Sequence, residues 1–173
     1  MSSNPRYAGL RAHPRTLPMA LLLSHDAVMR RFRPALSAFD LTEQQWHVLQ
    51  ALSSTTQVEI RDLAHTTCLE PTKLSRILKD LEDRGLVERR RSGRDMRLKL
   101  AAISSNGILL IDQLRPIAEE ISIEISNSYG GARVGELMEL LRELTAKLDE
   151  GSPTVFDETE PPRRRSDDHA HAS

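Results

Sequence analysis

The sequence PTKLSRILKDLEDRG, residues 71–85, decides the fold of this chain. Its large aliphatic residues recur at positions i, i+3, i+4 and i+7, which is the spacing of one face of an α-helix. They are Leu74, Ile77, Leu78 and Leu81. Pro71 suits the first turn of such a helix, and Gly85 suits the position just past its end. The pattern predicts a short helix that packs on a hydrophobic core through its leucines.

Basic residues gather around this helix, although the chain as a whole is nearly neutral. The formal net charge is −1 over 173 residues, yet Lys and Arg outnumber Asp and Glu by 11 to 7 between Arg61 and Lys99. Within the helix, Lys73, Arg76 and Lys79 recur every three residues, away from the leucines. A locally basic module in a neutral chain is typical of a protein that binds a polyanion through one face. The alternative is an ordinary solvated helical surface.

Residues on the N-terminal side predict two more helices. Thr42 followed by Gln45 is a capping-box pattern, and it begins a helix over 41–52. Residues 60–67 predict a short helix, and a tight turn at 68–71 joins it to the cationic helix. Two helices joined in this way form a helix-turn-helix, a motif that places its second helix in the major groove of DNA.

Residues 86–103 change from helical to alternating spacing around the turn pair Ser92-Gly93. Leu98, Leu100 and Ala102 alternate there with Arg97, Lys99 and Ala101. The pattern predicts a β-hairpin with a basic tip, called a wing, whose arginines reach a neighbouring minor groove. The arginines at 89–91 are expected at phosphates or in solvent.

Longer helices are expected on both sides of this unit. Residues 17–38 and about 106–127 are rich in apolar side chains, and residues 134–148 carry a leucine stripe. Pro34 is expected to bend or end the first of these helices, and Pro116 to kink or divide the second. The first helix is apolar on more than one face. In a small protein this favours burial against a partner chain.

Composition excludes several other classes of protein. Aromatic residues make up only 3 % of the chain, which favours helical packing by aliphatic side chains over a β-sandwich. The one cysteine, Cys68, permits neither an intramolecular disulfide nor a cysteine-based zinc site. No apolar run reaches the roughly 18 residues of a membrane span, and no signal peptide is recognisable, so a cytoplasmic protein is expected. No nucleophile–base pair, phosphate-binding glycine loop or metal-ligand cluster indicates an enzyme, so neither a cofactor nor a metal is expected.

Three segments resemble the winged helix-turn-helix of the MarR family of bacterial transcriptional regulators. They are LTEQQWHVLQAL (41–52), DLAHTTCLEPTKLSRILKDLEDRGLVER (62–89) and RDMRLKLAAIS (94–104). The third is similar to the family's wing signature through Asp95 and Arg97. The resemblance covers about residues 18–148. Residues 17–34, LPMALLLSHDAVMRRFRP, together with LTEQQW, are most similar to the subgroup that regulates homoprotocatechuate (4-hydroxyphenylacetate) degradation operons.

The resemblance implies a mainly α-helical fold with a small β-hairpin wing, working as a homodimer on double-stranded DNA. The first helix and the last two helices intertwine between two subunits, and the paired helices and wings read a pseudo-palindromic operator. The chain then divides into an N-terminal arm (1–16), a dimerisation helix (17–38), a winged helix-turn-helix region (39–104), two dimerisation helices (105–149) and a disordered tail (150–173).

The expected DNA contacts lie on the cationic helix and on the wing. The helix supplies Thr72, Lys73, Ser75, Arg76 and Lys79, and the wing supplies Arg94, Asp95 and Arg97. Arg76 is the best candidate for a guanine edge, because bidentate arginine–guanine contacts are the commonest specific ones. By resemblance, Arg97 enters the minor groove and Asp95 holds it in place, although aspartate is also a common turn residue. Ordinary solvent-facing side chains are the alternative for the whole set.

The resemblance also implies a small aromatic carboxylate as effector, bound between the dimer helices and the DNA-binding region. The candidate ligand residues are His25, Met29, Trp46, His47 and Cys68. The subgroup typically carries Arg-Glu-Ala where this chain has His-Asp-Ala at 25–27, so the usual arginine partner of a carboxylate is absent. The replacements that the sequence offers are a protonated His25, Arg11, Arg15 and Arg30. The alternative is that Trp46 belongs to the core and His25 to the surface.

Three functions stay open at the level of sequence. The first is a repressor of an aromatic-compound catabolism operon that a small aromatic acid releases from DNA. The second is an oxidant-sensing regulator that uses Cys68, although a single cysteine beside a leucine is more often a buried hydrophobe. The third is a helical adaptor that binds protein rather than DNA.

Overall fold

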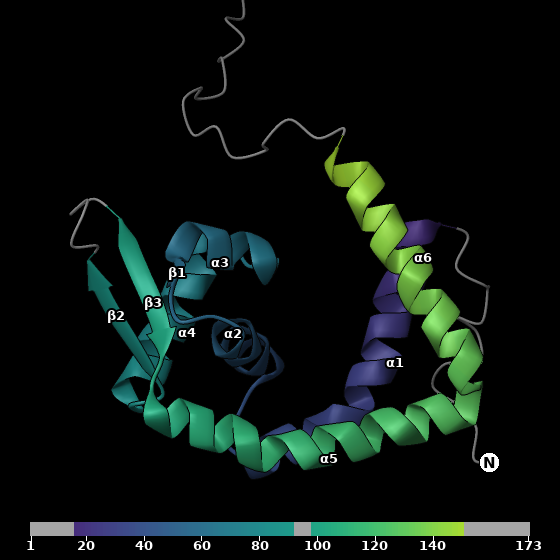
Figure 1. The fold of residues 1–173 in the computed structure, drawn as a ribbon, viewed down its shortest axis with the longest axis horizontal. Helices are drawn as coiled ribbons and strands as arrows, with labels where there is room; N and C mark the ends of the chain where they lie inside the picture. The colour runs from purple at the N-terminus through teal and green to yellow at the C-terminus, as the bar shows by residue number, and fades with distance from the viewer. Residues whose placement is uncertain (1–15, 92–97, 151–173) are drawn as a thin grey trace, which may run out of the picture. The chain divides into compact units, whose positions relative to one another are not determined.

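The computed structural model describes residues 16–91 and 98–150 (Figure 1). The elements follow in the order α1 Leu17–Ala38, α2 Glu43–Ser53, β1 Val58–Glu59, α3 Ile60–Thr66, α4 Pro71–Asp83, β2 Val87–Arg91, β3 Lys99–Ile103, α5 Ser105–Tyr129 and α6 Gly131–Asp149. The predicted fold class, mainly helical with a small β-hairpin, is confirmed. The chain divides into two compact units, residues 1–128 and 129–173. Among the described helices, none is long and apolar enough to cross a membrane.

α4 packs as its leucine spacing predicts. Leu74, Leu78 and Leu81 are fully buried, and Ile77 is half-buried against the same core. Gly85 follows the helix with φ +70°, a left-handed conformation that a residue with a β-carbon adopts only under strain. The chain therefore leaves α4 sharply and turns into the wing.

The turn between α3 and α4 exposes Cys68. This residue has φ +52°, and its thiol group is open to solvent. The next residue, Leu69, is half-buried on the core, and its N–H donates to the carbonyl of Ala64 (3.0 Å). The prediction that Cys68 is a buried hydrophobe is wrong, because the left-handed turn directs the following leucine inward instead.

The strands form one antiparallel sheet in the order β1-β3-β2. Val87 pairs with Ile103 at one end of the hairpin, which confirms the predicted wing up to the tip. Ala101 on β3 is fully buried, although the alternation predicted Leu100 on the apolar side. β3 is the central strand and packs against α2 and α3, so a small side chain fits beneath these helices. Leu100, on the other face, is only half-buried.

Neither predicted proline break ends its helix. α1 continues past Pro34 to Ala38, and α5 runs for 25 residues through Pro116. A proline removes one backbone hydrogen bond from a helix. Buried Phe32 and Leu36 flank Pro34, and buried Leu114 precedes Pro116 by two residues. The packing of these apolar side chains outweighs the loss of the bond.

The N-terminus of α2 is closed by the predicted capping box. The N–H of Gln45 donates to Oγ1 of Thr42 (3.2 Å), and the N–H of Thr42 donates to Oε1 of Gln45 (2.8 Å). Trp46 follows on the buried side and stacks on Phe32 of α1, with ring centroids 5.2 Å apart. The capping box and the stacked rings fix where α2 begins and how it faces α1.

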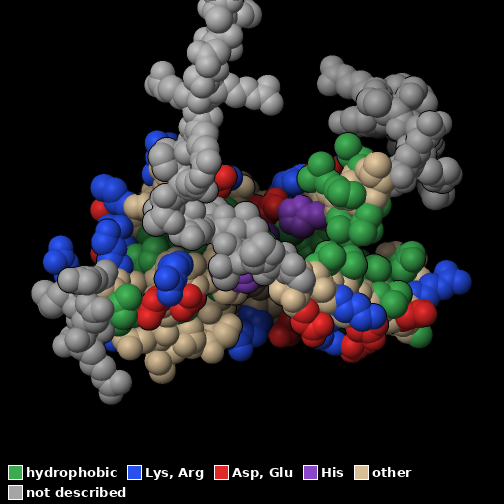
Figure 2. Space-filling view, turned by 90° about the horizontal axis from the view of Figure 1, so that it is seen from above, with side chains coloured by type: hydrophobic (Ala, Val, Ile, Leu, Met, Phe, Trp, Pro, Cys, Tyr) green, Lys and Arg blue, Asp and Glu red, His purple; other side chains and the backbone are tan. Residues whose placement is uncertain are grey.

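Large apolar side chains stay exposed on α1 and on α6, each taken by itself. They are Leu17, Met19, Leu21, Leu22, Leu23 and Val28 on α1, and Leu137, Met138, Leu140 and Leu148 on α6. Figure 2 shows apolar side chains, in green, forming part of the molecular surface. α6 buries no residue at all. Exposed apolar surface of this extent indicates a binding surface.

A close approach between the end of α4 and the start of α5 requires glycine at position 107. A β-carbon on Gly107 would lie 2.3 Å from the carbonyl oxygen of Leu86 and 2.7 Å from Cγ1 of Ile103. Ser104 tightens the same corner, because its hydroxyl donates to the carbonyl of Gly85 (2.6 Å) and accepts from the N–H of Gly107 (3.1 Å). These contacts join α5 to the base of the wing.

We expect Gly107→Ala to lower the free energy of unfolding by about 1–3 kcal/mol, because the added methyl group overpacks this corner. The matched control is Gly135→Ala in α6, where a β-carbon meets nothing within 4 Å and alanine favours the helix. Urea unfolding followed by circular dichroism measures both variants. An equal effect of the two substitutions would contradict the close approach at Gly107.

Candidate functional site

The predicted DNA contacts of α4 are all exposed to solvent: Thr72, Lys73, Ser75, Arg76 and Lys79. Except for Lys73, each of them lies two positions before an apolar residue of the inward face of α4. That offset places these side chains about 160° around the helix from the core-facing side. Nζ of Lys79 lies 2.8 Å from Oδ2 of Asp83, and this hydrogen bond raises the pKa of Lys79. Within residues 16–91 and 98–150, neither Lys73 nor Arg76 forms an ion pair. Of the three cationic residues of α4, Lys73 and Arg76 therefore have no acidic partner among the described residues.

Polar contacts hold α4 against α2 and the loop before it. Nε2 of Gln45 donates to Oδ2 of Asp80 at 2.5 Å. The guanidinium group of Arg84 donates to the carbonyl oxygens of Asp40 (2.9 Å) and Phe39 (3.5 Å). Because Gln45 also belongs to the capping box, the first turn of α2 sets the position of α4.

The base of the wing is tied to α4 by Arg89. Its Nε donates to Oε2 of Glu82 at 2.8 Å, and its Nη2 contacts the same oxygen. This hydrogen bond holds the pKa of the Glu82 carboxyl below its usual value. The expectation that Arg89 contacts phosphate or solvent stays a prediction, and within the described residues its partner is Glu82. The predicted tip residues Arg94, Asp95 and Arg97 lie outside the described residues.

The structure places His25, His47 and Trp46 side by side and Cys68 apart from them. Met29 and Trp46 are buried in the core, with 4 % and 7 % of their surface exposed. His25 and His47 lie together where α1 meets α2. Cys68 lies in the turn between α3 and α4.

A cleft of about 450 Å³ opens between α1, α2 and α5. Its apolar wall is made by Phe32, Trp46, Ile111, Leu114 and Ala118, and its polar lining by Gln50, Ser53, Ser54, Arg115, Glu119 and Ser122. Of the predicted ligand residues, Trp46 alone lines it. Arg115 donates to Oδ1 of Asp112 at 2.8 Å. Sequence reasoning missed Arg115, although a cation four residues after Ile111 in an apolar helix was an available signal.

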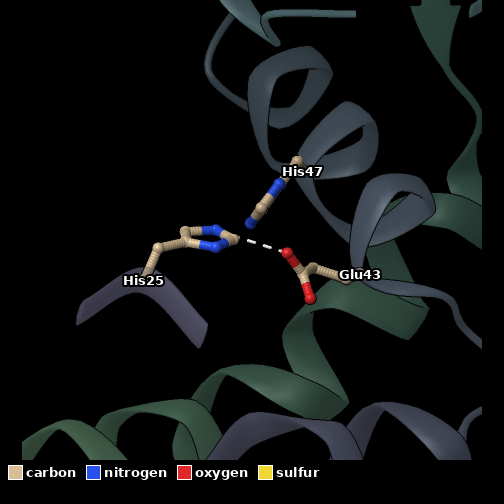
Figure 3. A group of neighbouring side chains, drawn as sticks. All are labelled: His25, Glu43 and His47. Carbon is tan, nitrogen blue, oxygen red and sulfur yellow. Dashed lines mark ion pairs between the residues drawn. The ribbon is translucent and has the colours of Figure 1, made fainter. Parts of the chain in front are cut away.

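Glu43 joins His25 and His47 where α1 faces the first turns of α2 (Figure 3). Nε2 of His25 lies 3.3 Å from Oε1 of Glu43, and the ring centroids of His25 and His47 are 6.3 Å apart. Arg33 reaches the other oxygen of Glu43 at 3.5 Å and Oδ1 of Asp26 at 2.8 Å. Sequence reasoning named His25 and His47 as candidate effector ligands but missed Glu43, although Glu43 and His47 stand one helical turn apart.

Comparison with known proteins identifies the family. Residues 41–99 match the model of the MarR family. Over 131 residues the chain is 30 % identical to the homoprotocatechuate degradative operon repressor of Escherichia coli, a match that covers 76 % of this chain and 88 % of the relative. The chain belongs to the MarR family. It is therefore a MarR-type transcriptional regulator, and the expectation that it is no enzyme is confirmed by its family.

Two other similar proteins support the same assignment. The HTH-type transcriptional regulator FarR of Neisseria gonorrhoeae is 30 % identical over 135 residues, which cover 78 % of this chain and 92 % of that protein. The crystal structure of NadR in complex with 4-hydroxyphenylacetate superposes with a TM-score of 0.72 at 27 % identity, covering 78 % of this chain and 98 % of NadR. The MarR-type fold thus extends over most of the chain.

Proposed function

We propose that this MarR-type regulator is a homodimeric repressor of an aromatic-compound catabolism operon and that a small aromatic acid releases it from its operator. The exposed stripe of α4 carries the DNA-binding part of the proposal. The buried leucines hold the helix in one rotational setting, and that setting points the polar and cationic residues outward. The similarity to a degradative operon repressor supports the choice of target.

α4 enters the major groove of the operator with its exposed stripe toward the bases. Arg76 donates to a guanine edge, and Thr72 and Ser75 bind phosphates or bases through their hydroxyl groups. Lys73 and Lys79 bind phosphates, which makes the affinity depend strongly on salt. The wing residues Arg94, Asp95 and Arg97 stay part of the proposal, with Arg97 in the minor groove. Two such units in a dimer read a pseudo-palindrome.

Arg76→Ala is expected to weaken operator binding by about 1–3 kcal/mol per half-site, because it removes a base contact. Fluorescence anisotropy with a duplex from the region upstream of the protein's own gene measures the affinity. Arg142→Ala is the matched control, since it removes an exposed arginine of α6 that pairs with Glu139. Wild-type affinity in Arg76→Ala over a series of salt concentrations would take Arg76 out of the reading set.

Support for the homodimer comes from the apolar surface of α1. Leu22 is 61 % exposed and Leu17 is 54 % exposed. Removing such surface from water is favourable by about 25 cal/mol for each Å² buried. A symmetric pair of chains covers the same residues twice, so the gain is doubled. α6, with its row of exposed leucines, adds a second apolar surface of the same kind.

Leu22→Asp is expected to raise the dissociation constant of the dimer at least about a hundredfold, because each copy loses the burial of one leucine. Sedimentation velocity over a range of protein concentrations measures the constant. Thr66→Asp introduces the same charge at an exposed position on α3 and is the control. A wild-type chain that sediments as a monomer at micromolar concentration would refute the dimer.

The cleft between α1, α2 and α5 is the proposed effector site. Its volume lies within the range of small-molecule pockets, about 300–1,000 Å³. Trp46 and Phe32 offer aromatic surface to a ring, and Arg115 offers a guanidinium group to a carboxylate. Arg115 thus replaces the arginine that is absent near His25. NadR, which has been crystallised with 4-hydroxyphenylacetate, supports an effector of this class.

4-Hydroxyphenylacetate is expected to bind the wild-type chain and to lower its affinity for the operator. Arg115→Gln should weaken the binding of this acid at least about tenfold, because it removes a charge-assisted pair of roughly 1.5–3 kcal/mol. Isothermal titration calorimetry measures the binding. Arg30→Gln is the matched control, since Arg30 pairs with Asp26 on α1 and does not line the cleft. Loss of binding in Arg30→Gln alone would move the site to α1.

An oxidant-sensing regulator is the second candidate function. The observation that favours it is the exposed thiol of Cys68 directly before α4. Oxidation of a side chain at that turn adds bulk and polarity beside the DNA-reading helix. Operator binding that hydrogen peroxide abolishes in the wild type, but not in Cys68→Ser, separates this function from the first.

A further inference from the structure

His25, Glu43 and His47 bring three metal-binding groups together at one place between two helices (Figure 3). Glu43 and His47 stand one turn apart on α2, so both side chains leave the same face of that helix. His25 comes from α1 and faces them. The candidate ligand atoms all lie within 4.8 Å of one another. Two helices therefore converge on one small volume with two imidazoles and one carboxylate.

The separations suit a small divalent ion. Nitrogen and oxygen ligands bind Zn²⁺ at about 2.0–2.2 Å, so two ligands of a tetrahedral ion stand about 3.4 Å apart. Nε2 of His25 and Oε1 of Glu43 are 3.3 Å apart. The ligand atom of His47 lies within 4.8 Å of the other two. The set leaves one tetrahedral position for water.

Neighbouring side chains hold the three groups in place. Arg33 contacts the second oxygen of Glu43 and is itself held by Asp26, so the carboxylate has a fixed orientation. The ring of Trp46 lies beside that of His47, with centroids 5.4 Å apart.

A bound anion, such as an aromatic carboxylate, would not fit well beside the carboxylate of Glu43. The carboxylate of Glu43 already faces His25, so an aromatic acid bound to His25 would meet a like charge. A divalent cation instead finds one negative charge and two nitrogen lone pairs. Imidazole ligands favour Zn²⁺ and related transition metals over Mg²⁺ and Ca²⁺, which prefer oxygen. The negative charge of Glu43 and the two imidazole ligands therefore both favour a divalent transition-metal ion.

We infer that His25, Glu43 and His47 form a binding site for one divalent transition-metal ion, with Zn²⁺ the best match. The bound ion joins α1 to the first turns of α2. Gln45, which lies between Glu43 and His47 in the sequence, donates to Asp80 of α4. The ion thus stiffens the part of α2 that positions the DNA-reading helix. The site does not depend on the proposed operator or effector.

The test is a metal titration of the full chain, stripped with a chelator and studied without DNA. Co²⁺ should give the visible absorption of a tetrahedral site, and Zn²⁺ should displace it at one ion per chain. His25→Ala and Glu43→Gln should each weaken Zn²⁺ binding at least about tenfold, since even outer-shell partners of metal ligands act at that scale. Zn²⁺ should also raise the melting temperature of the wild type but not of these variants.

His65→Ala, an exposed histidine on α3, is the matched control and should bind like the wild type. The double variant His169→Ala/His171→Ala tests the two histidines near the C-terminus. Circular dichroism confirms that each variant is folded. Wild-type affinity in His25→Ala and Glu43→Gln, or loss of binding in the double variant, would overturn the site. Because DNA is absent, this result is separate from the fate of the proposed repressor function.

Discussion

The buried face of α4 is the constraint on which the rest of the structure depends. Leu74, Leu78 and Leu81 leave no surface to solvent, and burying each side chain stabilises the fold by about 1.5–3 kcal/mol. A rotation by one residue, about 100°, would expose leucines and carry cationic groups toward the core. The helix therefore has one rotational setting. That setting alone turns Arg76 and its neighbours to the solvent.

Polar contacts then decide where α4 lies. A partly buried ion pair such as Arg89 with Glu82 contributes little energy, but it aligns the wing with the helix. α2 has the central place in this arrangement. It holds α4 through Gln45 and forms one wall of the cleft through Trp46. It also carries Glu43 and His47, two of the three proposed metal ligands. A ligand at either place would contact the helix that positions α4.

Sequence reasoning predicted most elements because their signals are local. The capping box at the start of α2, the leucine spacing of α4 and the hairpin after Gly85 each involve residues a few positions apart. It failed where packing outweighs a local rule. Of the kink or division expected at Pro116, the division is absent, because core contacts compensate for the missing hydrogen bond. Ala101 is buried because two helices cover the central strand. The division into DNA-binding and dimerisation regions stays a prediction.

The sequence by itself determined the family, through three segments that resemble MarR regulators, and the face of α4 that carries the cationic residues, through the spacing of its leucines. Only the tertiary structure decided which distant residues meet. Arg115 of α5 joins Trp46 of α2 in one cleft, and His25 of α1 joins His47 of α2, because α1 and α5 both pack on α2. Short-range sequence patterns do not encode such contacts between distant residues, because these contacts depend on how whole helices pack through their apolar faces.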